Sequence, residues 1–314
     1  MWVGQNRSWV RTVLLDGFAL PQIWGRTLAV TALSIGMTVL YEVVPPLHYS
    51  VTIAPFTIIG LPLGVFLGFR NNSAYDRFWE GRKLWGALVN TSRSLTRQVL
   101  TMMHPIGGAP DAPKPLELSK LELSMVHLVI AFAYALRDHL RETDPFEALA
   151  TTLPDEDVQR LRGEMNVPLG ILQRLGEHLS TAYRMRWVHA QHVSVMESSL
   201  VSLTDIQGAC ERIKSTPVPY SYTVLMHRIV ALYCGLLPFG LFETVDWATP
   251  LVVLAISYCM FALDAVGDEI EQPFGLDMND LPLSAIAHTI ERNLRHRIGE
   301  PGPASIAPVR GVLS

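Results

Sequence analysis

Four apolar runs dominate the pattern of hydrophobic and polar positions along the 314-residue chain. A helix that spans a membrane needs about 20 consecutive, predominantly apolar residues, and each run approaches that length. His227 and Arg228 interrupt only the start of the third run. We therefore predict four spanning helices, over residues 27–44, 51–69, 222–242 and 248–263.

The second predicted span carries two rows of residues that repeat every fourth position. On a helix, two rows that are offset by one residue lie side by side, about 100° apart. The small row predicts a surface that packs against neighbouring helices, and the bulky row presents apolar side chains in another direction. The small row is Gly60, Gly64 and Gly68, and the bulky row is Leu61, Val65 and Phe69.

The remaining sequence predicts a large helical part with polar surfaces. Apolar residues at helical spacing indicate helices over 70–103, 116–140, 168–214 and 283–298, the third being one long helix or two consecutive ones. Residues 116–140 have only about 12 apolar residues in a row, which favours a core helix over a span. Proline and glycine predict a linker over 104–115. Residues 5–22 predict an amphipathic segment along the membrane surface or packed on the protein.

Charge gives these elements an orientation. Residues 70–97 carry six arginines and lysines, whereas residues 45–50 carry none, so the positive-inside rule places both termini in the cytoplasm. The predicted parts are a surface or cytosolic segment (1–26), the first pair of spans (27–69), a cytosolic helical domain (70–221), the second pair (222–266), an acidic cytosolic segment and helix (267–298) and a disordered tail (299–314).

Composition agrees with a membrane protein and argues against several function classes. Only 17% of residues are charged, against roughly a quarter in soluble domains. The net charge of -4 gives no basic footprint for nucleic acid. The three cysteines are far apart in the sequence and indicate neither a disulfide framework nor a zinc site.

Catalysis has no support in the sequence, since it carries none of the common nucleotide-binding, metalloprotease or serine-hydrolase motifs. We expect no enzyme activity and no cofactor. His189 and His192 are three residues apart and could share a helical face as a metal pair. Without a third ligand nearby, a polar core or a lumen lining is the alternative.

Conduction does have support. Leu61, Val65 and Phe69 follow each other at about 6 Å along a helix, and a cyclic oligomer would turn them into stacked apolar rings on a shared axis. Such rings can gate ions by dewetting, and phenyl edges carry a partial positive charge that can face an anion. The alternative is that these side chains pack against the other three helices.

The sequence also resembles a known family. The runs PFTIIGLPLGVFLGFRNNSAYDRFWEGRKLWG (from Pro55), GACERIKSTPVPYSYTVLMHR (from Gly208) and DEIEQPFGLDMNDLP (from Asp268) are similar to bestrophin ion channels, especially bacterial members and plant thylakoid relatives. The resemblance implies an all-α, bestrophin-like homopentamer, with four transmembrane helices per subunit, a helical cytosolic domain and one axial pore.

The resemblance also implies site residues. The family's apolar neck falls on Leu61, Val65 and Phe69, where eukaryotic relatives favour aromatic residues at the later two positions. A second, cytosolic constriction falls on Gln191, with His189 and His192 adjacent.

A calcium clasp, as in animal members, would fall on Glu269, Gln272, Asp277 and Asp280. Leu276 and Met278 interrupt the acidic run here, and the alternative is an acidic belt that docks Arg7 or Arg11. The acids between Asp264 and Asp280 also supply a field that could attract cations.

We therefore expect an ion channel of the bacterial inner membrane that assembles with itself and passes small monovalent ions. Family resemblance favours chloride. The aliphatic neck positions and the acidic belt leave a sodium or potassium channel open. A membrane scaffold or signalling protein that conducts nothing is the alternative from another class.

Overall fold

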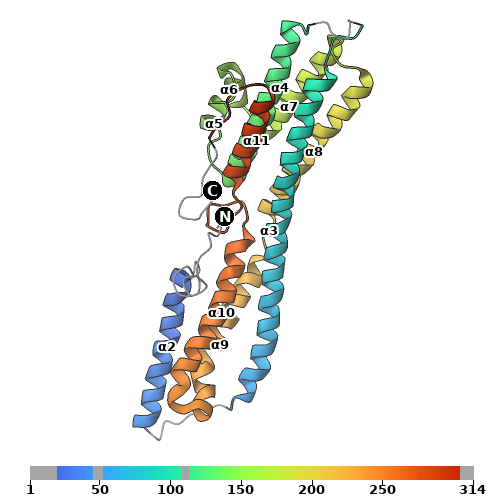
Figure 1. Cartoon of the computed structure of the whole chain (residues 1–314). Helices are drawn as coiled ribbons and strands as arrows, with labels where there is room; N and C mark the ends of the chain where they lie inside the picture. Colours follow the sequence, from blue (N-terminus) through green and yellow to red (C-terminus); the bar gives the residue numbers. More distant parts are fainter. Residues whose placement is uncertain (1–19, 45–51, 108–112, 305–314) are drawn as a thin grey trace. The chain divides into compact units, whose positions relative to one another are not determined.

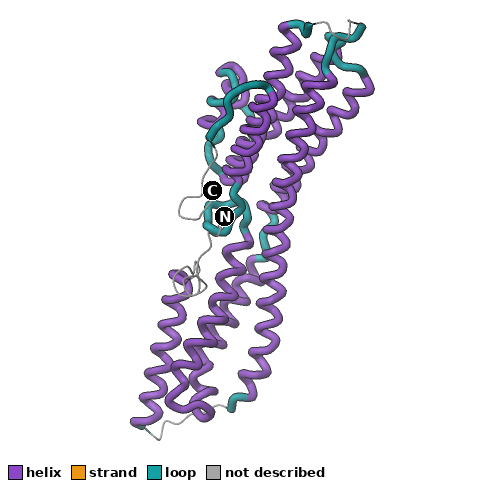
Figure 2. Tube along the Cα trace, viewed as in Figure 1, coloured by secondary structure: helices purple, strands orange, loops and turns teal. Residues whose placement is uncertain are grey.

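The computed structural model describes residues 20–44, 52–107 and 113–304, with the side chains of residues 20–22 left aside. Its described residues form helices joined by loops and turns, with no strand among them (Figures 1 and 2). The all-α prediction is therefore confirmed. The chain divides into two compact units. The membrane unit comprises residues 4–78 and 217–272, and the second unit comprises residues 79–216 and 273–314 together with residues 1–3.

The membrane unit contains the four predicted spans. They are α2 (Leu20–Val43), the first part of α3 (Ala54–Met102), α9 (Tyr220–Val245) and α10 (Thr249–Glu271), with the short helix η2 (Asp246–Ala248) between the last two. Helix α10 packs against both α2 and α9. Buried residues from all four helices meet in one apolar core, made of Ile23, Leu63, Leu67, Val230, Cys234, Phe261 and Ala265.

One unbroken helix of 49 residues, α3, covers both the second predicted span and the helix predicted over 70–103. This agrees with the sequence, where helical periodicity continues past residue 69 without a Gly-Pro stop. Pro62 lies inside α3 and cannot donate the backbone hydrogen bond that would reach the carbonyl of Ile58. The helix therefore belongs to both units, with residue 78 as the last in the membrane unit.

The second unit is built around α4 (Leu116–Arg141), which is buried from Val129 to Leu136 without a break. Length and composition alone would also allow α4 to cross a membrane. Its burial against other helices of the unit instead supports the predicted core helix. The other helices here are α5 (Phe146–Ala150), α6 (Asp155–Leu161), α7 (Val167–Arg184), α8 (Ala190–Ser215) and α11 (Leu283–Arg297), of which α7 and α11 make the closest contacts with α4.

Polar side chains connect α4 to α11 inside the second unit. The hydroxyl of Tyr134 donates to Glu291 at 2.6 Å, and Arg295 joins Glu291 to Glu300. Burial, followed by the hydrogen bond and negative charge of Glu291, raises the pKa of Tyr134 far above its usual value. Glu300 also pairs with His127 at 3.0 Å, so the first described residues of the predicted tail, 299–304, are held to the unit at this side chain.

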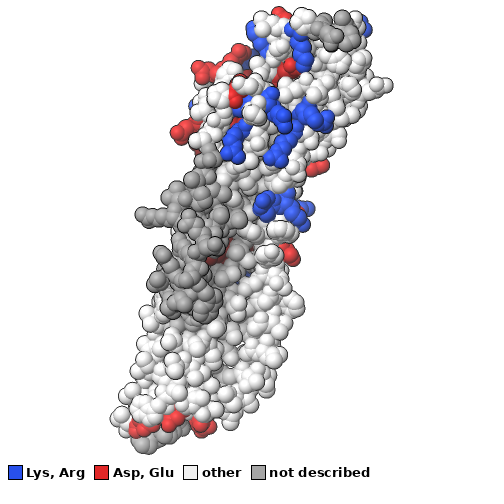
Figure 3. Space-filling model, viewed as in Figure 1, with Lys and Arg blue, Asp and Glu red and all other residues white. Residues whose placement is uncertain are grey.

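Charge is distributed differently over the two units. In the space-filling view, the spans of the membrane unit are almost entirely free of charged atoms, and acids gather at one end (Figure 3). The exposed acids Glu42, Glu243 and Asp246 stand at the ends of α2 and α9. Lysine and arginine side chains gather on the visible face of the second unit. This distribution fits a lipid bilayer that surrounds the membrane unit alone.

Candidate functional site

The bulky apolar row on α3 is exposed within the single chain. Leu61, Val65 and Phe69 have exposed fractions of 73%, 49% and 61%. Leu63 and Leu67, which alternate with them along the sequence, are instead buried in the core of the membrane unit. The row therefore does not pack against the other three spans, which was the alternative interpretation, and its role as a pore neck stays a prediction.

The glycine row has a close neighbour only at its first position. A Cβ atom at Gly60 would lie 2.5 Å from the hydroxyl of Tyr233 on α9, whereas Gly64 and Gly68 have nothing within 4 Å among the described residues. Inside one chain, two of the three glycines thus adjoin open space. The predicted packing surface, if it exists, must be completed by another molecule.

A buried ion-pair network begins directly after Phe69. The guanidinium of Arg70, whose side chain is fully buried, donates to Asp264 at 2.8 Å and also to Asp268. His227 Nδ1 lies 2.7 Å from the second oxygen of Asp264, and Arg26 approaches that oxygen at 3.8 Å. All four spans contribute a side chain to this network, which fixes α3 to the rest of the membrane unit at the end of the apolar row.

This network has the residue types of a metal site but also contains its own cation. His227, Asp264 and Asp268 offer ligand atoms within 4.8 Å of one another. Arg70 already neutralises both carboxylates, so a metal ion would have to compete with a buried guanidinium. The arrangement therefore fits a structural lock better than a metal centre.

The histidines of the predicted second constriction lie at the start of α8. His189 precedes the helix and its ring lies 5.9 Å from the ring of His192 and 5.9 Å from that of His104. Gln191 is exposed at the same helix start. The structure thus brings these side chains together and adds His104, which the sequence did not single out. Their role as a constriction remains a prediction.

The four residues of the predicted calcium clasp are divided between the units. Glu269 lies in the last turns of α10 and Gln272 follows that helix. Asp277 and Asp280 belong to the second unit, where the backbone N–H of Asp277 donates to Asp280 at 2.7 Å. Within the described ranges, the only cluster with metal-ligand geometry is the one at His227. Arg7 and Arg11, the proposed partners of an acidic belt, lie outside the described residues.

Comparison with known proteins identifies the family. A family model described as bacterial and fungal bestrophin protein matches residues 1–296. The chain belongs to the bestrophin family. This bestrophin is 36% identical to a voltage-dependent anion channel-forming protein of Ralstonia nicotianae, with 100% of this chain and 99% of the relative covered. A protein with the same description from Escherichia coli K12 is 36% identical over 312 residues, covering 99% of this chain and 98% of the relative.

Solved structures agree with this assignment. A crystal structure of a bacterial bestrophin homolog from Klebsiella pneumoniae matches with a TM-score of 0.81 and 34% identity. The match covers 88% of this bestrophin and 99% of the other chain. The fold of the family therefore applies to nearly the whole chain.

Sequence reasoning missed the Arg70 network as a unit. The sequence predicts only that a basic segment begins at residue 70 and that Asp264 and Asp268 belong to an acidic field. The partners are about 190 residues apart in sequence, so spacing could not connect them. The available signal was one arginine and two carboxylates that each border an otherwise apolar run.

Proposed function

We propose that this bestrophin is a homopentameric channel of the bacterial inner membrane that conducts small monovalent anions, chloride favoured, through an axial pore. The observation that carries the proposal is the exposed apolar row of Leu61, Val65 and Phe69 on α3. Lipid would tolerate such a row, but its four-residue repeat would also form stacked rings around a shared axis. An axis shared by copies supplies the pathway that one chain of apolar spans lacks.

In this proposal residues 27–69 and 222–266 cross the membrane, and both termini lie in the cytoplasm. The cytosolic part comprises residues 70–221 and 267–298. The arginines and lysines of the second unit support this orientation, as do the exposed acids Glu42, Glu243 and Asp246 at the opposite ends of the spans. Alkaline phosphatase fusions after residue 47 and after residue 247 are expected to be active, and fusions after residue 107 inactive.

Two considerations favour anions over cations. The relatives from Ralstonia and Escherichia are described as anion channel-forming proteins. In addition, the acidic field that favoured cations is weakened, because Arg70 pairs with Asp264 and Asp268.

Reversal potentials test both the conduction and the ion. The purified oligomer is placed in planar bilayers under a KCl gradient, and the sign of the reversal potential names the permeant ion. A potential near that of chloride is expected. A potential near that of potassium would replace the anion channel with a monovalent cation channel of the same fold. Absence of any current from intact oligomers would favour a scaffold that conducts nothing.

A further inference from the structure

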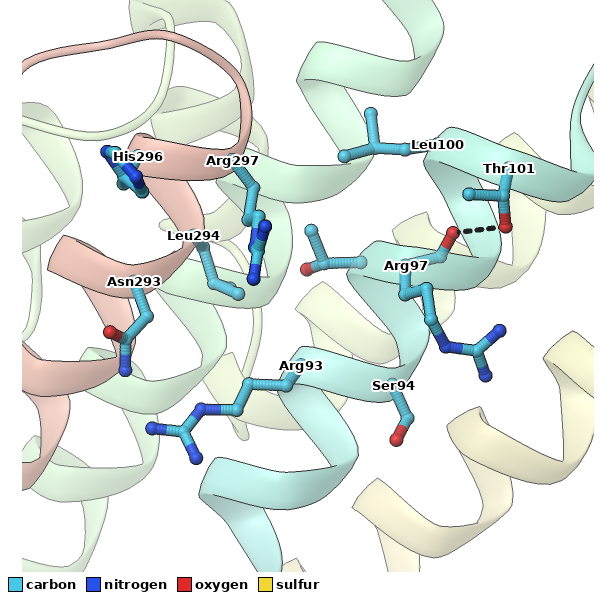
Figure 4. Close-up of a pocket in the computed structure, with 10 residues that line it drawn as sticks. Arg93, Ser94, Arg97, Leu100, Thr101, Asn293, Leu294, His296 and Arg297 are labelled. Carbon is cyan, nitrogen blue, oxygen red and sulfur yellow. Dashed lines mark hydrogen bonds between the residues drawn. The ribbon is translucent and has the colours of Figure 1, made fainter.

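A hollow of about 740 Å³ opens in the second unit between α3 and α11. In the close-up, Arg93 extends from α3 toward Asn293 on α11, and Arg297 points from the end of α11 into the space between the helices (Figure 4). Arg97 lines the hollow at its rim and points to the other side of α3. Both walls thus carry positive charge.

Among the described residues, none that lines this hollow is acidic. Some arginines of the second unit pair with carboxylates, as Arg174 does with Asp157 and Arg295 with Glu291. In the part of the chain that the structure describes, Arg93, Arg97 and Arg297 have no such partner. The carboxyl end of α11 favours a cation at Arg297, but it explains neither Arg93 nor Arg97 on α3. Arg93 and Arg297 bring like charges to one hollow, and a bound anion would offset their mutual repulsion.

Two of the residues that line the hollow carry buried polar atoms without a hydrogen-bond partner among the described residues. Thr96 is only 1% exposed, and its hydroxyl has no partner among the described residues. Thr101, five residues later, shows the usual alternative, because its hydroxyl donates to the carbonyl of Arg97 at 2.7 Å. The side-chain amide nitrogen of Asn293 is buried and likewise without a partner. Buried donors of this kind are ordinarily satisfied.

The remaining wall is apolar. Leu294 is 1% exposed and lines the hollow opposite Leu100. A volume of about 740 Å³ lies in the range of pockets that bury small organic ligands, and a phosphate group alone would leave most of it empty. Arginine forks suit phosphate oxygens in particular, because two parallel N–H bonds match two oxygens.

We propose that this hollow binds an organic phosphate of about nucleotide size. Arg93 and Arg297 hold the phosphate, Thr96 and Asn293 donate to it, and the organic part lies against Leu100 and Leu294. Since α3 carries Arg93 as well as the predicted neck residues, the ligand would bind the cytosolic portion of the same helix. The inference does not depend on which ion the channel conducts.

Titration calorimetry of the full-length protein in detergent, without divalent cations, tests the proposal with ADP and inorganic pyrophosphate as probes. Both are expected to bind with a Kd below 1 mM, and ADP at least threefold more tightly because of the leucine wall. Raising KCl from 50 to 300 mM is expected to weaken both several-fold, as for other charge-driven contacts.

The variant R93Q/R297Q removes the two charges while keeping polar side chains, and it is expected to lose at least tenfold in affinity for both probes. R184Q, which removes an exposed arginine of α7, is the matched control and is expected to bind like the wild type. Equal unfolding temperatures of the three proteins exclude misfolding as the cause. Equal affinity of R93Q/R297Q and wild type, no binding of either probe, or equal affinity for ADP and pyrophosphate would overturn the proposal. So would dissociation of the R93Q/R297Q oligomer, since the arginines would then serve a neighbouring copy.

Discussion

Individual side chains of the membrane unit separate into two groups that alternate along α3. Leu63, Leu67 and Arg70 face the interior of the unit, whereas Leu61, Val65 and Phe69 are exposed. A residue-scale change therefore has a different expected consequence in each group. Interior changes should alter stability, and changes in the exposed row should alter conduction.

Shortening the exposed row should ease ion passage. Leu61→Ala or Phe69→Ala removes apolar volume and weakens dewetting at the neck, so we expect at least a twofold rise in single-channel conductance or open probability in planar bilayers. Ile59→Ala is the control, because Ile59 is similarly apolar and 51% exposed but lies on a different face of the helix. Unchanged currents in both neck variants, or an equal rise in the control, would show that Leu61 and Phe69 do not form the neck of the pore.

The Arg70 network should respond unequally to the loss of its two carboxylates. Asp264 is 2% exposed at its side chain and Asp268 is 40% exposed. Removing one partner of a buried pair leaves an uncompensated charge, which costs about 3 kcal/mol or more. A partly exposed pair contributes under about 1 kcal/mol. Thermal unfolding in detergent should therefore show a clearly larger drop in Tm for Asp264→Asn than for Asp268→Asn. Equal drops would contradict the role of Asp264 as the buried partner that stabilises Arg70.

At the scale of elements, the sequence predicted where helices exist better than where they end. A helix covers each of the four predicted spans, and α10 continues past the end of the fourth, at residue 263, to Glu271. The prediction stopped where the carboxylate of Asp264 interrupts the apolar run. Arg70 neutralises that carboxylate from a distant part of the chain, and a pattern read along one segment cannot contain this partner.

The sequence does not decide, for a related reason, whether residues 168–214 form one helix or two. Residues 184–190 contain neither glycine nor proline, the usual signals of a helix end. The chain nevertheless turns at Arg186, which has a φ of 58°. Two backbone N–H groups of the linker, at His104 and Ile106, donate to the carbonyls of Trp187 and Arg186. These hydrogen bonds join segments about 80 residues apart in sequence, and local propensity does not report them.

The contact between α9 and α3 gives an element-scale prediction. A Cβ at Gly240 would lie 2.2 Å from the ring of Phe56, whereas one at Gly235 on the same helix would have nothing within 4 Å. Gly240→Ala should cost about 1–3 kcal/mol, since the ring must move in a packed interior. Gly235→Ala should be neutral or stabilise by up to about 1 kcal/mol, because alanine favours the helix. The unfolding temperatures of the two variants, compared with that of the wild type, test this difference. A Gly240→Ala protein that unfolds at the temperature of the wild type would show that α9 and α3 separate readily.

At the scale of the whole molecule, one chain leaves the proposed site incomplete. Composition and apolar runs suffice to predict a membrane protein with four spans, and the resemblance supplies the family. The neck, however, would be formed by copies of one helix face. No pattern within a single sequence shows how many copies meet, so the pentamer rests on the family resemblance and requires a direct measurement.

Native mass spectrometry of the detergent-solubilised protein should give five times the 34.9 kDa of one chain. If the glycine row contacts a neighbouring copy, Gly64→Leu should release smaller species, because a bulky side chain would fill the space where two subunits meet. Gly36→Leu on α2 is the control, since Gly36 also has nothing within 4 Å. A Gly64→Leu protein that stays as intact as the control would place the glycine row against lipid.

Pro62 gives α3 an uneven stiffness along its length. The helix extends about 70 Å at 1.5 Å per residue, and its interior turns are braced by backbone hydrogen bonds. The hydrogen bond missing at Pro62 would reach back to Ile58, so the most compliant turn of this long helix is the one that carries Leu61, just before Val65 and Phe69. A torque applied to α3 beyond Phe69 would turn Val65 and Phe69 together. The compliant turn at Pro62 would absorb part of it before it reached Leu61. In the proposed pore, the ring of Leu61 can therefore widen separately from the rings of Val65 and Phe69.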